Sequence, residues 1–362
     1  MILAAVAALT LASCAKIDTI KVEENTGAIP VAFSNYVPRS MTKASSSLVD
    51  GAALANNTHF GVYAWATAYT GNNPTPLSGN PGTPNFMSNV DVNYLNDTNT
   101  GSGNTYSPLR FWPSGDKPDY LSFTAYYPYN GAGITAPTFS ANTAGEYAFT
   151  AQNEAANMID FMVADVVNDQ VYGATNKYGL TSNVDHKGTV QFTFRHQLTK
   201  VQFKFKKSTG LGATTVVELL DAKLAGIQNQ GTLTATYHPA VAEPAAAAYT
   251  STAWSDQTGA QGYEIFVNSG ENKKNPEYTA PSTVSNPVTL ADDATTTVDN
   301  SAIFLMVPQT MEDATQQLSV TWRVRVYDTA GHASDNAGTA VGGLLSETIS
   351  TSEARANSPK SA

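Results

Sequence analysis

Alternation of apolar and polar side chains is the feature that most constrains the fold of this chain. The clearest run extends from Val190 to Phe205, and a second run extends from Leu318 to Tyr327. A period of two residues is that of a half-buried β-strand. Further strands are expected at residues 29–33, 59–65, 120–128, 215–224 and 231–237. No segment predicts a helix longer than two turns, so short strands at this spacing indicate β-sandwiches.

Length, charge and cysteine content exclude several classes of function. A chain of 362 residues is long enough for about two domains. Charged residues make up only 14% of it, the net charge is −10, and the 20 basic residues are spread thinly. No basic surface for nucleic acid or for an anionic membrane is therefore expected. The single cysteine excludes intrachain disulfides and any zinc site built from cysteines.

The N-terminus predicts export and lipid attachment. Residues 2–12 form an apolar run that is too short to span a bilayer but has the length of a signal-peptide core. The segment Leu11–Cys14 that follows looks like the lipobox of bacterial lipoproteins, although no Lys or Arg precedes the run. The alternative is an ordinary buried cysteine. We expect a lipoprotein signal peptide at residues 1–13, lipidation of Cys14, and a flexible tether at residues 14–28.

Six segments in a fixed order resemble the fimbrillin family of Bacteroidota, the subunits of type V pili. They are Leu11–Cys14, Phe60–Ala64, Trp112–Pro113 with Leu121–Pro128, Asp160–Ala164, Phe192–Val201 and Phe304–Gln309. The resemblance implies a mostly β fold with two transthyretin-like β-sandwich domains in tandem, at residues 29–184 and 185–362. It also implies a structural subunit or adhesin that needs no cofactor and is not an enzyme.

The resemblance further implies how such a subunit assembles. In the family, a precursor lipoprotein of the outer membrane loses its N-terminal strand to an arginine-specific protease. A strand of another pilus subunit then fills the groove, which is β-augmentation of an unpaired sheet edge. The expected partners are other pilus subunits, the outer membrane through the lipid on Cys14, and a ligand on a host or bacterial surface.

A cleavage site is expected directly after the first strand. Ile29, Val31 and Phe33 alternate with smaller residues and would form the displaced strand. Arg39 follows in a polar stretch that a protease can reach, and Lys43 is a weaker alternative. Either residue could equally be an ordinary solvated side chain of a loop.

The C-terminal residues differ from the family pattern. Ser346–Ala362 contains one large apolar residue, Ile349, and no alternation, so no donor strand is expected there. Two explanations stay open. Either the chain is truncated, or this subunit accepts a strand without donating one.

Residues with catalytic or metal-binding chemistry show no informative spacing. His196 lies between apolar residues of a strand and is expected to make a structural hydrogen bond. The remaining histidines have no ligand spacing, so no metal site is predicted; they are His59, His186, His238 and His332.

A rival function is a surface glycan-binding lipoprotein of a polysaccharide-uptake system. Such a protein should present two or three coplanar exposed aromatic side chains, whereas a pilus subunit should bury them. The aromatic residues that distinguish the two functions are Trp65, Phe111, Trp112, Tyr126, Tyr127 and Tyr129.

Overall fold

The computed structural model describes residues 29–38, 51–68, 82–95, 105–114, 119–140, 143–154, 157–171, 188–203, 205–206, 210–211, 215–239, 248–267, 288–289, 303–310, 315–326 and 344–350. These ranges contain strands and no α-helix, which confirms the mostly β prediction. The strands are β1 (Ala32–Tyr36), β2 (Thr58–Thr67), β3 (Met87–Tyr94), β4 (Tyr120–Tyr127), β5 (Thr143–Thr150), β6 (Met162–Ala164), β7 (Val167–Gln170), β8 (Thr189–His196), β9 (Thr199–Val201), β10 (Thr215–His238), β11 (Tyr249–Val267), β12 (Val288–Thr289), β13 (Phe304–Met306), β14 (Gln317–Val326) and β15 (Leu344–Ser350). Within the described ranges, no helix is long and apolar enough to cross a membrane.

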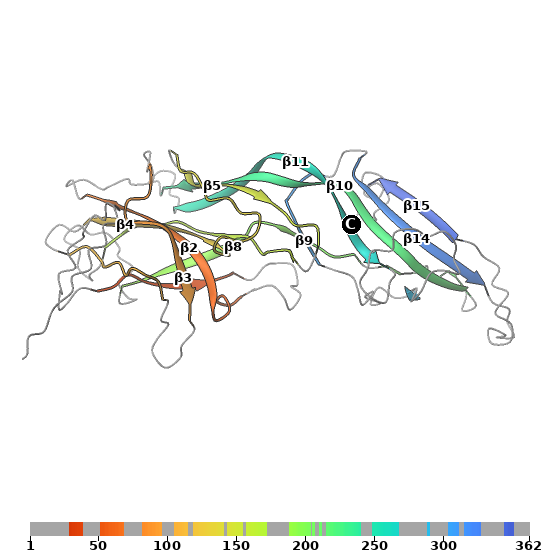
Figure 1. Ribbon diagram of the computed structural model, residues 1–362, viewed down its shortest axis with the longest axis horizontal. Coiled ribbons are helices and arrows are strands. Elements are labelled where there is room, and N and C mark those ends of the chain that lie inside the picture. The colour runs from red at the N-terminus through yellow and green to blue at the C-terminus, as the bar shows by residue number, and fades with distance from the viewer. Residues whose placement is uncertain are drawn as a thin grey trace, which may run out of the picture.

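The first sheet has the strand order β1-β8-β6-β4-β2-β3, with β7 pairing to β4. Its strands β2, β3, β4 and β8 are labelled in the left half of Figure 1. β1 runs parallel to β8, and the other pairs are antiparallel. Although β8, β6 and β4 separate β1 from β2 in the sheet, the rings of Phe33 and Phe60 lie 6.4 Å apart. The sheet therefore curls, and its inner face encloses an aromatic core. Its outer face is also covered, because Tyr63 and Trp65 pack against β5 and β10.

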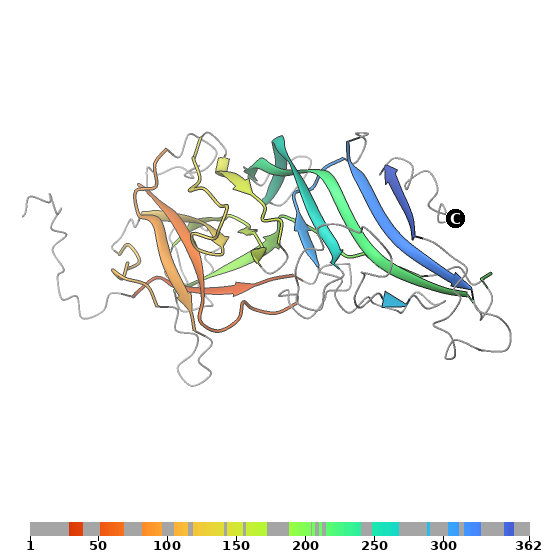
Figure 2. The ribbon, with the colours of Figure 1, turned by 45° about the vertical axis from the view of Figure 1, so that its right-hand side comes forward.

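The second sheet is built on β10, a strand of 24 residues (Figure 2). The C-terminal half of β10 pairs with β5 and lies over the first sheet, where Leu233 and Ala235 join its outer core. The N-terminal half pairs with β14 and β12, and there Leu219 and Leu224 belong to a separate core. β11 follows β10 along most of its length, and β15 pairs with β14. One strand thus contributes to two hydrophobic cores.

Each of the two sheets contains strands from both sides of the domain boundary expected between residues 184 and 185. β8 begins at Thr189 yet lies between β1 and β6 in the first sheet. β10 pairs with β5, which belongs to the part of the chain before that boundary. The division into two tandem domains stays a prediction about folding units, since hydrogen-bonded strands join the two expected parts.

The separate strands expected at 215–224 and 231–237 are one continuous strand. The intervening residues lack alternation because β10 is irregular there, with a shift of register against β11 between Leu224 and Ile227. Gly226 has a φ of +72° at this irregularity, a conformation that favours glycine. β15, which overlaps the C-terminal residues in which no donor strand is expected, was not predicted as a strand, and it pairs with β14.

Candidate functional site

The segment that contains β1 lies along β8, with its apolar side chains turned into the inner core. The pairing with β8 is in register from Ala32 opposite Thr189 to Tyr36 opposite Thr193. Val31 and Phe33 are fully buried, and Ile29 is half-buried against the same core. Tyr36, on the other side of the strand, is 40% exposed. The alternation in the sequence therefore corresponds to one buried and one outward side of this segment.

Phe33 is the central apolar contact of this segment. Its ring stacks on Phe192 of β8 at a centroid distance of 5.5 Å. It also contacts the rings of Tyr106 at 5.6 Å and Phe123 at 5.9 Å. Tilted and edge-to-face pairs of this kind each add about 0.5–1.5 kcal/mol beyond the buried area. Phe33 therefore fills a pocket lined by aromatic rings.

Residues 105–112, here called the strap, cover the edge of the segment that faces away from β8. The Val31 amide donates to the Arg110 carbonyl oxygen (2.8 Å), and the Trp112 amide donates to the Ile29 carbonyl oxygen (2.9 Å). The Tyr106 hydroxyl donates to the Val31 carbonyl oxygen (2.8 Å). The strap occupies the edge that would otherwise be free for pairing.

Residues 51–54 hold the C-terminal end of the segment in the same way. The Val37 amide donates to the Ala52 carbonyl oxygen (2.8 Å), and the Gly51 amide donates to the Val37 carbonyl oxygen (3.0 Å). The Asn35 side-chain oxygen accepts a hydrogen bond from the Leu54 amide (2.7 Å). Residues 29–37 thus lie in a slot with backbone partners on both sides. We call this slot, formed by β8, the strap and residues 51–54, the β1 seat.

Three residues expected to take part in processing lie outside the described residues. They are Cys14, Arg39 and Lys43. Pro38 is the last described residue before the stretch that contains Arg39 and Lys43, so the expected cleavage positions directly follow the β1 seat. Lipidation and cleavage stay predictions.

Segments that carried the family resemblance meet in the structure. β6 pairs with β8, so that Met162 lies opposite His196, and β9 pairs with β13. His196 Nδ1 lies 2.8 Å from Asp160 Oδ1, and the two side chains are 21% and 14% exposed. This is the structural hydrogen bond expected of His196. The described residues contain no group of three or more His, Cys, Asp or Glu side chains that could hold a metal ion.

The aromatic residues proposed for glycan stacking do not form an exposed platform. Trp65, Trp112 and Tyr126 are buried, and Tyr127 and Tyr129 are half-buried. Only Phe111 of the six is exposed, at 43%. Five of the six therefore belong to the protein interior or its margin, and the glycan-uptake function is not favoured.

A family model described as fimbrillin-like matches residues 42–340. The chain belongs to the fimbrillin-like family. It is 30% identical over 230 residues to fimbrium subunit Fim1C of Phocaeicola vulgatus, a match that covers 62% of this chain and 55% of that protein. The chain thus spans about half the length of this curated relative. The crystal structure of a fimbrial protein from Bacteroides vulgatus superposes with a TM-score of 0.52 at 21% identity, over 88% of this chain and 87% of that one.

Membership of the family agrees with the prediction that the chain is not an enzyme, because fimbrillins are structural subunits of fimbriae. Sequence reasoning found the strand of this fimbrillin but missed the strap and residues 51–54. Trp112 was singled out as part of a motif and as a candidate for glycan stacking, not as a contact of the first strand. Its indole nitrogen donates to the Gly188 carbonyl oxygen (2.8 Å) and so ties the strap to the start of β8.

Proposed function

We propose that this fimbrillin is a structural subunit or adhesin of a cell-surface pilus that assembles by strand exchange. Export as a lipoprotein on Cys14 would bring it to the outer membrane. Cleavage at Arg39 would then separate β1 from the rest of the chain and allow it to leave. The observation that carries the proposal is the β1 seat, in which a terminal segment has backbone partners on both sides directly before a candidate cleavage site.

Loss of residues 29–37 would leave a surface that only another extended segment could cover. The backbone groups of β8, Arg110 and Ala52 that pair with β1, Val31 and Val37, respectively, would lose their partners. Each buried polar group left without a partner costs about 1–3 kcal/mol. The rings of Phe192 and Phe123 would also lose their contact with Phe33. An incoming strand with large apolar residues at alternate positions restores both kinds of contact.

Cleavage with an arginine-specific protease tests the proposal. The chain is prepared with Cys14→Ser so that it stays unlipidated, and native sizing and N-terminal sequencing follow digestion. We expect a new N-terminus at Ser40. Oligomers should follow where a segment of this chain donates a strand to the vacated β1 seat, and a cleaved monomer would identify a subunit that accepts a strand without donating one. The Arg39→Ala variant should stay intact and monomeric, whereas Lys43→Ala should behave as the parent. Assembly of uncleaved Arg39→Ala would contradict the proposal.

A peptide tests the seat directly, without reliance on a donor strand from the chain. A labelled peptide of residues 29–38 should bind the cleaved protein once mild denaturant has removed the protein's own N-terminal segment. A Phe33→Ala peptide should bind about 100-fold less tightly, because truncating a buried Phe costs about 3 kcal/mol or more. A Ser34→Ala peptide is the matched control, since Ser34 lies on the outward side of β1. Equal affinity for all three peptides would contradict the proposal that the peptide binds in the β1 seat through Phe33.

Lipidation is tested separately in cells. We expect a palmitate analogue to label the wild-type chain, and we expect the Cys14→Ser variant to stay unlabelled and to leave the membrane fraction. Labelling of Cys14→Ser would place the lipid elsewhere, because the chain has no other cysteine.

A further inference from the structure

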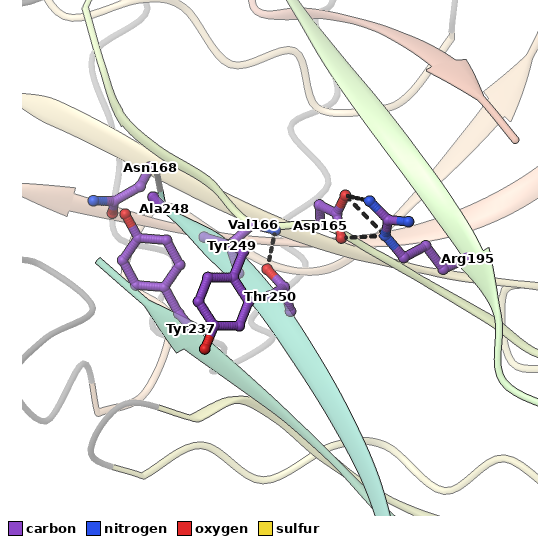
Figure 3. Close-up of a pocket in the computed structure, with 8 residues that line it drawn as sticks. All are labelled: Asp165, Val166, Asn168, Arg195, Tyr237, Ala248, Tyr249 and Thr250. Carbon is purple, nitrogen blue, oxygen red and sulfur yellow. Dashed lines mark hydrogen bonds and ion pairs between the residues drawn. The ribbon is translucent and has the colours of Figure 1, made fainter. Parts of the chain in front are cut away.

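A pocket of roughly 270 Å³ opens between the two sheets at the end of the β10–β11 hairpin (Figure 3). Asp165 comes from the segment that links β6 to β7, Asn168 comes from β7, and Arg195 comes from β8. Tyr237 is the last but one residue of β10, and Tyr249 is the first residue of β11, opposite His238. The pocket is distinct from the β1 seat, because Arg195, its lining residue on β8, lies beyond Thr193, the last residue of β8 that pairs with β1.

Hydrogen bonds between the two sheets fix the walls of this pocket. The Val166 amide donates to the Thr250 hydroxyl oxygen (2.9 Å) and so joins the first sheet to β11. The Asp165 amide donates to the Thr193 carbonyl oxygen (2.9 Å). Tyr237 is only 7% exposed, and its ring belongs to the core between the sheets. A ligand would therefore meet a largely preformed site, which lowers the entropic cost of binding.

The charged groups of the pocket cancel each other. Arg195 Nε donates to both oxygens of Asp165, at 2.8 and 3.0 Å, and Nη2 donates to Oδ2 at 2.7 Å. Asp165 raises the pKa of Arg195 further, so the guanidinium stays charged. A forked pair of this kind leaves lone pairs and N–H groups for a ligand but carries no net charge. The site thus offers donors and acceptors without favouring an anion or a cation.

Tyr249 provides a flat apolar surface at the rim of the pocket. Its side chain is 56% exposed, the highest value among the large apolar side chains of the described residues. One face of its ring stacks on the His238 imidazole, at a centroid distance of 4.3 Å and an angle of 12°. His238 is itself held by Ser251, with Nε2 and Oγ 2.8 Å apart. The ring is therefore held in orientation although it is exposed.

We propose that this pocket binds one pyranose ring of a neutral saccharide. A pyranose has an apolar face of C–H groups, which suits the ring of Tyr249, and a rim of hydroxyls that both donate and accept hydrogen bonds. Asp165 and Arg195 supply the complementary acceptors and donors, whereas the Asn168 side chain is engaged with Ser122 and Asp169. Pockets for drug-sized ligands measure about 300–1,000 Å³, so this smaller pocket fits a single sugar unit. The inference does not depend on strand exchange.

Saturation-transfer NMR on the uncleaved chain tests the proposal. The probes are the methyl glycosides of β-glucose, β-galactose and α-mannose. A ligand of this size is expected to bind with a Kd on the order of 1 mM. Tyr249→Ala should weaken binding at least tenfold, whereas Tyr36→Ala, at an exposed tyrosine on β1, should leave it unchanged. Thermal unfolding of both variants checks that the fold is intact. No transfer to any probe at 10 mM, or undiminished transfer in Tyr249→Ala, overturns the proposal.

A charge change gives a second, independent test. Asp165→Asn leaves Arg195 without its carboxylate partner, so the pocket should then favour an acidic sugar over a neutral one. We expect methyl β-glucuronide to bind this variant at least tenfold more tightly than it binds the parent. Methyl β-glucoside should bind the variant more weakly than it binds the parent. An unchanged order of preference would show that the Asp165–Arg195 pair does not contact the ligand and would overturn the proposed mode of binding.

Discussion

At the scale of single residues, the fit between Gly61 and Tyr126 explains why glycine occurs in one of the family-like segments. Gly61 lies in β2 opposite Tyr126 of β4. A Cβ at Gly61 would overlap the Tyr126 ring and would crowd the Asn89 side-chain oxygen. The Tyr126 hydroxyl donates to that same oxygen at 2.8 Å. The glycine makes room for a buried tyrosine and its hydrogen bond.

Gly61→Ala should therefore destabilise the protein by about 1–3 kcal/mol, the usual cost of overpacking a core. Gly262→Ala is the control. The nearest atom to its new Cβ is the Leu224 carbonyl oxygen at 3.9 Å, an ordinary contact. This change should be neutral or slightly stabilising, because it restricts the unfolded chain. Urea unfolding of both variants measures the difference, and equal stability would contradict the steric argument.

Asp169 of β7 is a second residue whose environment can be measured, because its carboxyl makes the stability of the protein depend on pH. Burial raises the pKa of its carboxyl to about 7 from an ordinary value of 3.8. The folded protein therefore holds a proton there that the unfolded chain has released. Stability should fall as the pH rises from about 4 to about 7 and should level off above that range.

Asp169→Asn should remove this part of the pH dependence and stabilise the protein at pH 7.5. Asparagine also tolerates the positive φ of +53° at this position. The measurement is the free energy of unfolding at half-unit steps from pH 4.5 to 7.5. Asp119→Asn, at an exposed carboxylate, serves as control and should keep the parent slope. A parent-like slope in Asp169→Asn would mean that another group titrates.

At the scale of elements, the pairing of β1 with β8 decides whether the seat can open. Ser34 and Gln191 lie opposite each other on the outward side of these strands. Neighbouring strands are about 4.8 Å apart, which suits a disulfide between facing positions. A bond there would keep β1 in place after cleavage.

The variant Ser34→Cys with Gln191→Cys, in a Cys14→Ser background, should be cleaved by the protease yet stay monomeric while oxidised. Reduction should restore assembly, because β1 can then leave its seat. Native sizing with and without dithiothreitol measures the change, and each reduced sample serves as its own control. Oligomers that form equally well from the oxidised protein would show that assembly does not use this seat.

The elements also show why some of the fold could be predicted and some could not. β1 and β8 alternate apolar and polar residues because one side of each faces a core. β11 was missed because most of its described side chains are exposed or half-buried, so its sequence has no alternation. The strap was missed because its bonds to Val31 span more than 70 residues, and the bond with Arg110 joins backbone groups only. Pairing through the backbone leaves no local pattern.

At the scale of the whole molecule, β10 couples the two ends of the structure. Leu233 lies in the core between the sheets, Leu219 lies in the core beneath β14, and both side chains are fully buried. Because both belong to one strand, loss of either core should disturb the pairing of the other. Cooperative unfolding of the whole body is therefore expected.

Leu219→Ala and Leu233→Ala should each cost about 2–5 kcal/mol and should shift one shared transition in calorimetry. The ratio of calorimetric to van't Hoff enthalpy should stay near one for the parent and for both variants. Tyr249→Ala is the control on the surface of the same hairpin and should shift it little. Two transitions, each lowered by only one of the leucine variants, would instead support two tandem domains that fold independently.

The length of β10 has a mechanical consequence. At about 3.3 Å per residue, its 24 residues extend close to 80 Å along the curved path of the strand. A fully stretched chain reaches at most about 3.3–3.6 Å per residue, so β10 has little slack apart from its irregularity at Gly226. A pull along the molecule therefore cannot lengthen this strand gradually. The covalent backbone of β10 resists the pull first, and the molecule yields only where neighbouring strands slide past β10.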